Sequence, residues 1–342
     1  MSVARSRSGN KGFSLVELMV GMLLGLILIG GAVSIYLASK QSYVEVEQVA
    51  ILTENARFAE QIMADSLRHV GFLGEVSPDR VDYSDLDATS VPVDCNDPAE
   101  AGAYDLSRLA FAATTDTFDC ITDGKPDTDV LVIKHVLPQP ISDSPRDDGS
   151  GGDSNPGNGV IDSLQDGRVY VMTNNVGGQL FDGAAPPTIT TGGAFPDGTA
   201  WEYQYEVFYI RQPTPADVPW LSRRLLSYNA ATSTMEFVTE DLAEGVEGLR
   251  LLFGYDGDGD GEVDTYSSHA DIDGDNWLNV ESVEVFMLVR NATEDAQYTD
   301  NKTYRLGNDT ITVDPEYVHY RRLISHSSVS LRNLKLIIRG DA

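Results

Sequence analysis

An uncharged, apolar run from Leu18 to Ser39 constrains this chain more than any other feature of its sequence. A helix of this length rises about 33 Å, which is enough to cross the hydrocarbon core of a bilayer. Secretory signal peptides have shorter apolar regions, of roughly 7–15 residues, and end at a small-residue cleavage site. The run therefore predicts a retained membrane helix rather than a cleaved signal peptide.

Charged residues flank this run unevenly. Arg5, Arg7 and Lys11 precede it without any acidic residue, so the positive-inside rule keeps the leader cytoplasmic and places the rest of the chain beyond the inner membrane. A single carboxylate, Glu17, stands where the apolar run begins. Because a carboxylate at membrane depth is costly, its presence points to a function.

The helical pattern continues beyond the membrane segment. Apolar and small residues recur at steps of three and four, with charged residues between them: Tyr43, Val46, Val49, Leu52, Ala56, Ala59, Ile62, Met63, Ser66, Leu67 and Val70. This spacing predicts an amphipathic helix whose apolar stripe covers a sheet. We expect one continuous helix from Phe13 to Val70, ending before Gly71.

The rest of the chain is rich in strands and loops. The predicted fold class is α+β, with the long N-terminal helix packed on an antiparallel sheet and with loop insertions. Residues 138–167 are rich in Pro, Gly, Asp and Ser and predict a flexible loop, and residues 202–209 alternate as a half-exposed strand should. The predicted strands are Asp129–Val136, Arg168–Thr173, Trp201–Gln212, Leu221–Tyr228, Met235–Thr239, Glu247–Tyr255, Val283–Arg290, Tyr320–Ser325 and Leu334–Arg339.

Composition narrows the range of partners. With 24 Lys and Arg against 53 Asp and Glu, the net charge is −29, which disfavours nucleic acid and favours divalent cations. The chain has two cysteines, Cys95 and Cys120. In an oxidising compartment we expect them to form a disulfide; two free buried thiols are the alternative.

The leader Lys11-Gly12-Phe13-Ser14-Leu15-Val16-Glu17 resembles that of type IV pilins and type II secretion pseudopilins. The resemblance implies that prepilin peptidase cleaves between Gly12 and Phe13, that Phe13 is then N-methylated, and that Glu17 is the conserved fifth residue of the mature chain. The α-amine of Phe13 on a neighbouring subunit lies at the same depth and is a suitable partner for the Glu17 carboxylate. We expect this pairing to fix the register of an assembling filament.

Three further stretches resemble the PilW-type minor pilins: Glu54–Ala59, Val246–Asp256 and Arg321–Asn333. The resemblance implies a minor pilin that assembles with other minor pilins, the major pilin and a large tip adhesin in the complex that starts the pilus and stays at its tip. The expected organisation is a leader (1–12), a transmembrane half-helix (13–39), a periplasmic half-helix (40–70) and a globular head (71–342). After assembly the head is extracellular.

An acidic loop, Asp256-Gly257-Asp258-Gly259-Asp260-Gly261-Glu262-Val263-Asp264, has the spacing of a calcium-binding loop. Its acidic side chains occupy positions 1, 3, 5 and 9, Gly261 occupies position 6, and Glu262 at position 7 offers its backbone carbonyl. Position 12, which is a bidentate Glu in an EF-hand, is Ser267. We therefore expect Ca²⁺ binding of weak, extracellular type, without flanking EF-hand helices; a solvated acidic turn is the alternative.

Two further acidic stretches are weaker candidates, and the whole calcium-loop region spans residues 256–282. The second has oxygen ligands at Asp271, Asp273, Asp275 and Asn279, and the third, residues 153–162, has its spacing displaced by one residue. We therefore expect one or two calcium sites.

No catalytic motif stands out, and we expect that the protein is not an enzyme. The aromatic residues Trp201, Tyr203, Tyr205, Phe208 and Tyr209 could line a sugar site, but packing within a sheet explains them better. Two alternatives to the minor-pilin role remain open. One is a minor pseudopilin of a type II secretion system, and the other is a membrane-tethered, calcium-dependent binding domain.

Overall fold

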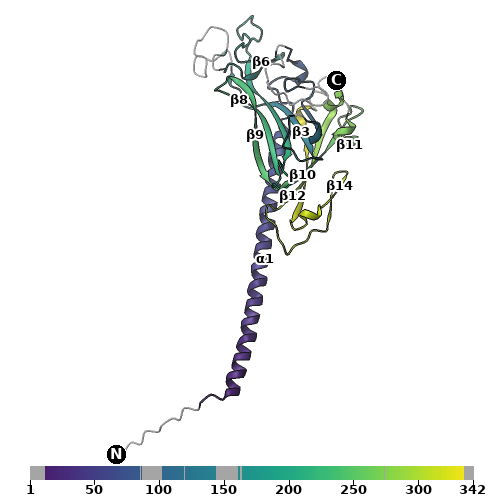
Figure 1. Ribbon diagram of the computed structural model, residues 1–342. Helices are drawn as coiled ribbons and strands as arrows, with labels where there is room; N and C mark the ends of the chain where they lie inside the picture. The colour runs from purple at the N-terminus through teal and green to yellow at the C-terminus, as the bar shows by residue number, and fades with distance from the viewer. Residues whose placement is uncertain are drawn as a thin grey trace, which may run out of the picture. The chain divides into compact units, whose positions relative to one another are not determined.

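The computed structural model describes residues 12–84, 86, 102–118, 120–143, 161, 164–272 and 274–334. The chain divides into two compact units, which meet between Ile51 and Leu52. Helix α1 (Leu15–His69) is continuous through this boundary (Figure 1). The predicted helix from Phe13 to Val70 is therefore confirmed to within two residues at its start and one at its end.

The unit that begins at Leu52, here called the head, is built mainly from strands. Its described strands are β1 (Val81–Asp82), β2 (Ala110–Thr114), β3 (Asp129–Val136), β4 (Ser142–Asp143), β5 (Val169–Thr173), β6 (Gly178–Asp182), β7 (Thr199–Arg211), β8 (Trp220–Asn229), β9 (Thr234–Glu244), β10 (Val246–Tyr255), β11 (Thr265–Ser267), β12 (Val280–Arg290), β13 (Thr303–Leu306), β14 (Asp309–Thr312) and β15 (Arg322–Ser330). Short 3₁₀ helices connect them: η1 (Pro78–Arg80), η3 (Thr115–Thr117), η4 (His269–Asp271), η5 (Gly274–Asn279) and η6 (Pro315–Tyr317).

The larger sheet is organised around β7. Its strand order is β1-β6-β5-β7-β3-β2, with β4 and β8 also paired to β7 and β9 paired to β8. All of these pairs are antiparallel except β1 with β6. The long strand β7 pairs with different strands along its length. Its first half pairs with β4 and β5, and its second half pairs with β8.

The smaller sheet has the antiparallel order β11-β10-β12-β15. Strands β13 and β14 form a separate two-stranded hairpin. The hairpin packs on this sheet through a small apolar cluster of Leu288, Tyr304 and Leu306. The α+β class with a mostly antiparallel sheet is therefore confirmed.

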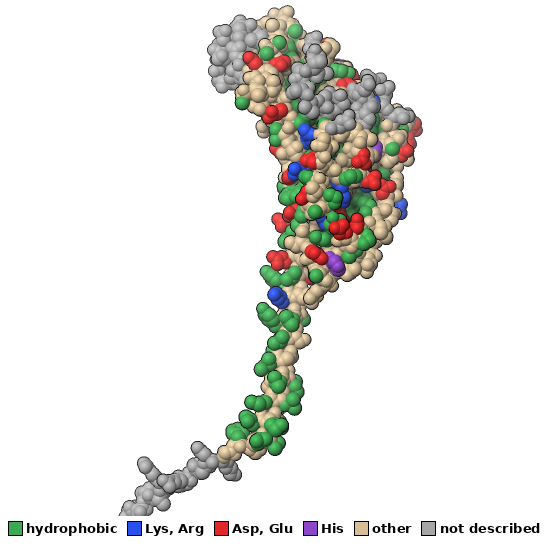
Figure 2. All heavy atoms as spheres, viewed as in Figure 1, with side chains coloured by type: hydrophobic (Ala, Val, Ile, Leu, Met, Phe, Trp, Pro, Cys, Tyr) green, Lys and Arg blue, Asp and Glu red, His purple; other side chains and the backbone are tan. Residues whose placement is uncertain are grey.

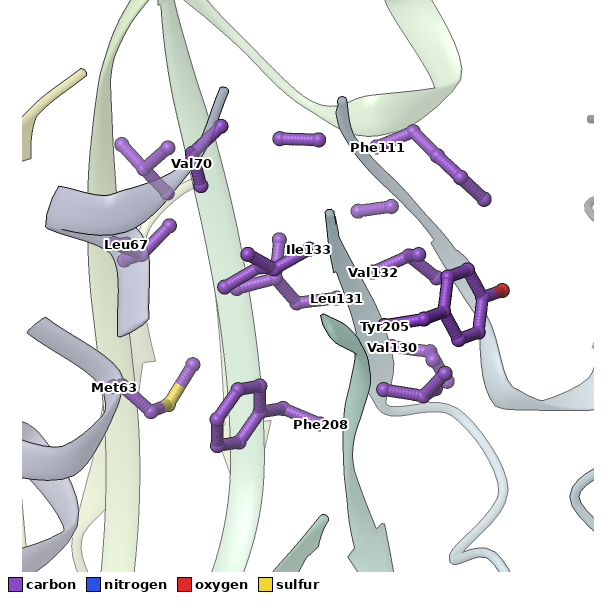
Figure 3. Packing of buried hydrophobic residues seen from close by; sticks show 14 of the residues in the cluster. Met63, Leu67, Val70, Phe111, Val130, Leu131, Val132, Ile133, Tyr205 and Phe208 are labelled. Carbon is purple, nitrogen blue, oxygen red and sulfur yellow. The ribbon is translucent and has the colours of Figure 1, made fainter. Parts of the chain in front are cut away.

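The C-terminal part of α1 packs on the head through a stripe of small and apolar side chains. Its buried residues are Leu52, Ala56, Ala59, Met63, Ala64 and Leu67. Figure 3 shows Met63 and Leu67 beside the core residues of the sheet, among them Phe208 and Ile133. The helix ends at His69, two residues before Gly71. The φ of Gly71 is +70°, which suits glycine, and its N–H donates to the carbonyl of Lys134 on β3.

Polar bonds hold the part of α1 from Leu52 onward on the rest of the head. The Asn55 side chain donates to the carbonyl of Glu244 at 3.1 Å, Ser325 donates to the Glu60 carboxylate at 2.9 Å, and Asn333 donates to the carbonyl of Val70 at 2.9 Å. These contacts join α1 to β9, to β15 and to the chain that follows β15. The predicted covering of a sheet by the apolar stripe is confirmed from Leu52 onward.

The prediction of one exposed face for residues 202–209 is wrong. Side chains on both faces of β7 are buried or nearly so. Phe208 faces α1. On the opposite face, the Tyr203 hydroxyl donates to the carbonyl of Ala103, and the Tyr209 hydroxyl donates to Asp123 at 3.1 Å. Loops that contain Ala103 and Asp123 cover this second face, which is why it is buried rather than exposed. The preferred explanation of the aromatic cluster, packing within a sheet, is confirmed by the burial of all five rings.

Eight of the nine predicted strands match observed strands, with differences at their ends. The ninth predicted strand, Leu334–Arg339, lies outside the described residues apart from Leu334. Strands β1, β2, β4, β6, β11, β13 and β14 were not predicted. They are short, and β2 consists mostly of alanine, so neither length nor alternation marks them. Most of the predicted loop 138–167 also lies outside the described residues.

Candidate functional site

The predicted cleavage site lies at the beginning of the described chain. Gly12 and Phe13 precede the helix in irregular structure, and the Phe13 side chain is 86% exposed. The structure therefore leaves the Gly12–Phe13 peptide bond open to a protease.

Ser14 and Glu17 form a reciprocal capping box at the start of α1. The Ser14 N–H donates to Oε2 of Glu17 at 3.0 Å, and the Glu17 N–H donates to Oγ of Ser14 at 3.2 Å. This arrangement satisfies two backbone donors at the helix start. Sequence reasoning missed this role, although the Ser-x-x-Glu spacing at a helix start would have revealed it. One carboxylate oxygen caps the helix, and Oε1 remains for a second partner.

The apolar segment of α1 is exposed over its whole circumference. Among the described residues, α1 is the one helix long and apolar enough to cross a membrane, and its most apolar stretch is not buried in the chain. Figure 2 shows this part of the helix covered with hydrophobic side chains. A Cβ added at Gly21 or Gly25 would meet nothing within 4 Å, so the fold of the single chain does not require these glycines. They leave a surface that another helix can approach closely.

Three carboxylates converge in the loop that joins β10 to β11. Ligand oxygens of Asp256, Asp258 and Asp260 all lie within 4.8 Å of one another. Calcium–oxygen distances are about 2.3–2.6 Å, so two ligands on opposite sides of the ion are separated by about 5 Å. These three side chains are therefore close enough together to bind one Ca²⁺ ion.

Backbone donors hold this loop in shape around Asp256, which is 2% exposed. Gly259 N–H donates to Oδ1 and Gly261 N–H to Oδ2 of Asp256, both at 2.7 Å. Gly259 and Gly261 have φ of +78° and +85°, which explains glycine at both positions. Burial favours the neutral form of Asp256, but the backbone N–H donors outweigh it and the pKa lies below its ordinary value.

The remaining predicted ligands of the first loop are placed differently. Asp264 turns its Oδ2 toward Gly257 N–H at 2.8 Å, while the Glu262 N–H donates to Asp260 Oδ1 at 2.8 Å. Ser267 lies on β11, which pairs with β10. The loop is therefore the turn of a β-hairpin, and the expectation that it has no flanking EF-hand helices is confirmed.

The second acidic loop is only partly described. Asp271 accepts a hydrogen bond from Ser268 Oγ at 2.8 Å, and the carbonyl of Asn279 accepts from Asp256 N–H at 3.2 Å. Asp273 and the side chain of Asp275 lie outside the described residues, as does nearly all of the third candidate, residues 153–162. Within the described part of the chain, one cluster of acidic ligands is therefore assembled, at Asp256, Asp258 and Asp260.

The predicted disulfide falls partly outside the described residues. Cys120 is half-buried beside the head core, and Cys95 is not among the described residues. The pairing remains a prediction.

Sequence reasoning also missed a set of charged residues inside the head. Lys125, Arg290 and Arg322 contact Glu247 in a groove that Arg250 also lines. They come from segments far apart in the sequence, so no local spacing could identify them. One signal in the sequence could have indicated a buried charge: Arg290 stands at the end of an apolar strand.

Comparison with known families gives two matches. The family model described as Type IV Pilus-assembly protein W matches residues 207–333, and the Prokaryotic N-terminal methylation motif matches residues 7–33. The first match includes the acidic loop and the charged groove except its wall of residues 124–128, and the second includes the predicted cleavage site and Glu17. No curated protein and no solved structure matches the chain.

Proposed function

Since the chain belongs to the PilW family of type IV pilins, we propose that it is a minor pilin that acts in the complex initiating pilus assembly and remains at the pilus tip. Its role is structural, not enzymatic. Its partners are other minor pilins, the major pilin and a tip adhesin, and prepilin peptidase processes it. The head occupies the periplasm before assembly and the cell exterior afterwards.

The observation that carries this proposal is the geometry at the helix start. Cleavage after Gly12 gives each subunit a cationic α-amine at Phe13, four residues before Glu17. The Glu17 carboxylate uses Oε2 to cap its own helix, which leaves Oε1 for the amine of a neighbouring subunit. In lipid, this pairing compensates two charges that would otherwise be costly to bury.

Substitution of Glu17 tests the assembly role. We expect Glu17→Ala to be cleaved and inserted normally but to be absent from sheared pili, with pilus number reduced at least tenfold. The measurement is immunoblotting of sheared and cell-bound fractions. Glu54→Ala, which removes an exposed carboxylate from the same helix, should assemble normally.

A second variant separates helix capping from subunit pairing. Ser14→Ala removes one capping bond but keeps the Glu17 carboxylate, so it should retain most of its assembly. Normal assembly of Glu17→Ala would overturn the pairing. Equal loss in Ser14→Ala and Glu17→Ala would assign the requirement to helix capping.

We also propose that Asp256, Asp258 and Asp260, with the carbonyl of Glu262 and with Asp264 after a side-chain rotation, bind Ca²⁺ in the extracellular head. The convergence of three carboxylates and the preformed turn support this site. The ion would neutralise the repulsion of the acidic loop and hold the β10–β11 hairpin. The second loop, with Asp271, Asp273, Asp275 and Asn279, is the place for a second ion.

A further inference from the structure

A groove with a volume of about 940 Å³ crosses the head between its hairpin and two loops. One wall is residues 124–128, another includes Pro213, Pro215 and Pro219, and the floor is β10 from Glu247 to Arg250. The third wall is the continuous stretch from Asp309 to Asp314. A cavity of this size is within the range that holds a ligand or a short peptide.

The third wall presents an unpaired strand edge. Within the described part of the chain, strand β14 pairs with β13 alone, in a separate two-stranded sheet. All residues of β14 line the groove while β13 contributes none, so the free edge of β14 faces the groove. In an antiparallel pair every second residue turns its N–H and C=O away from its partner strand. The groove is therefore bordered by backbone donors and acceptors that an extended chain can use.

Most charges on the groove floor are paired with one another. Arg322 bonds to Glu247 at 2.5 Å, Lys125 Nζ donates to the carbonyl of Glu247 at 2.5 Å, and Arg250 contacts Asp309 and Asp129. These bonds are structural, because they join β10 to β15, to the 124–128 loop and to the hairpin.

Arg290 differs from the other cations of the groove. Its side chain is 4% exposed, and its Nε and Nη1 atoms have no hydrogen-bond acceptor among the described residues. Glu247 Oε2 lies 3.5 Å from Nε, and Nη2 has one long bond to the carbonyl of Asp217. The guanidinium lies 4.9 Å from the ring of Tyr317 and 4.6 Å from that of Tyr320. A buried guanidinium with unused donors is unfavourable, and an added carboxylate would relieve it.

We propose that this groove binds an extended, acidic segment of another pilus subunit, which adds to β14 as a third strand and directs an Asp or Glu carboxylate to Arg290. Tyr317 covers Arg290 and holds its hydroxyl on the carbonyl of Pro215 at 2.6 Å, at the surface. Opening of this hydrogen bond lets the carboxylate reach Nη1. An isolated two-stranded hairpin is marginally stable, so a third strand also stabilises β13 and β14.

The proposal that the segment belongs to another pilus subunit rests on the proposed assembly role. That the segment is extended and acidic is inferred from the residues of the groove. An acidic polysaccharide could satisfy Arg290, but it lacks the regularly spaced amide groups that pair with a strand edge. The free edge of β14 therefore favours a polypeptide.

Photocrosslinking in piliated cells tests this proposal on the full chain. Benzoylphenylalanine is placed at Thr310 or Thr312 on the groove edge, and at Val176, an exposed position in the turn between β5 and β6, as the control. We expect the two edge probes to capture one segment of another pilus subunit at positions two residues apart, as strand pairing requires. That segment should contain Asp or Glu.

Arg290→Gln should lower the crosslinking yield at Thr312 at least fivefold, whereas Arg305→Gln, an exposed arginine on β13, should leave it unchanged. Thermal melting of each variant shows whether the head is folded. If Arg290→Gln does not fold, the two edge probes in the chain with Arg290 still test strand pairing through the spacing of the captured positions. Yields no higher than at Val176, a captured segment without acid, a polysaccharide adduct or a segment from outside the pilus would each overturn the proposal. The assembly role is judged separately, by Glu17→Ala.

Discussion

The two parts of α1 differ in what surrounds their apolar side chains. From Leu15 to Ile51 no residue is buried in the single chain, although most are apolar. From Leu52 to His69 one face is buried in the head and the other is polar or exposed. The side chains of one helix therefore suit two environments. Those of the first part suit apolar surroundings such as lipid or neighbouring helices, and those of the second part suit the sheet of the same chain.

The side chains of the two parts reflect these environments. The buried stripe includes Ala56 and Ala59, which bring the helix backbone close to the head. In the first part, glycine occurs at Gly21 and Gly25 without any packing demand from its own chain. In the second part, small residues allow the helix backbone to approach its own head closely. In the first part, the described chain supplies no such packing partner at Gly21 and Gly25.

The largest expected effect is on the stability of the head. Leu67→Ala removes a fully buried side chain and should lower the free energy of unfolding by about 2–5 kcal/mol. Leu26→Ala, in the exposed part, should change head stability by less than about 0.5 kcal/mol. Denaturant unfolding of the full chain in detergent measures both. Equal losses would show that the two parts do not differ as described.

For membrane insertion, a substitution in the first part of α1 should have a larger effect than one in the second part. Leu28→Lys places a charge near the centre of the apolar segment, at a cost of about 2.5–3.5 kcal/mol. A large fraction of this variant should be extracted from membranes by alkaline carbonate, while Leu28→Ile and Leu67→Ala should stay in the pellet. Full retention of Leu28→Lys would argue against a bilayer around this position.

Calcium should affect only the head. At a free concentration one hundred times the dissociation constant, a bound ion stabilises the folded state by about 2.7 kcal/mol. Chelation should therefore lower the melting temperature of the head, and Asp256→Asn should remove this calcium dependence. Glu294→Gln, which changes an exposed acid elsewhere, should keep it. Identical melting with calcium and with chelator would refute the site.

The smallest expected effect concerns pH at the junction of α1 with the sheet. His135 stacks on His69 of α1 at 5.7 Å between ring centroids, and burial lowers the pKa of His135 despite the nearby Glu206. The unfolded chain then binds more protons than the folded one below about pH 6.5, so stability falls as pH falls through this value.

Melting temperatures between pH 8 and pH 5 measure this contribution. His135→Gln should show a shallower decline than the unaltered chain, because it lacks the titrating ring while other acidic groups are unchanged. Parallel declines in the two proteins would assign the pH dependence to other groups.

Much of this molecule follows from local sequence patterns. The apolar run, the three- and four-residue spacing and the alternating Asp and Gly residues predicted α1, its buried stripe and the convergence of Asp256, Asp258 and Asp260. Each of these features depends on residues within one or two turns of chain. The burial of both faces of β7 and the short strands did not follow, because the segments that cover or pair with them are distant in sequence.

The sequence by itself determined the long apolar helix and the shape of the acidic loop, and it predicts the cleavage site with Glu17, since periodicity, charge and glycine act locally. The tertiary structure alone decided where α1 leaves solvent, which face of β7 is covered by loops, and how Arg290 comes to lie beside the free edge of β14. These features arise when strands separated by many residues pair. Register and burial, rather than local preference, then fix which polar groups remain without partners.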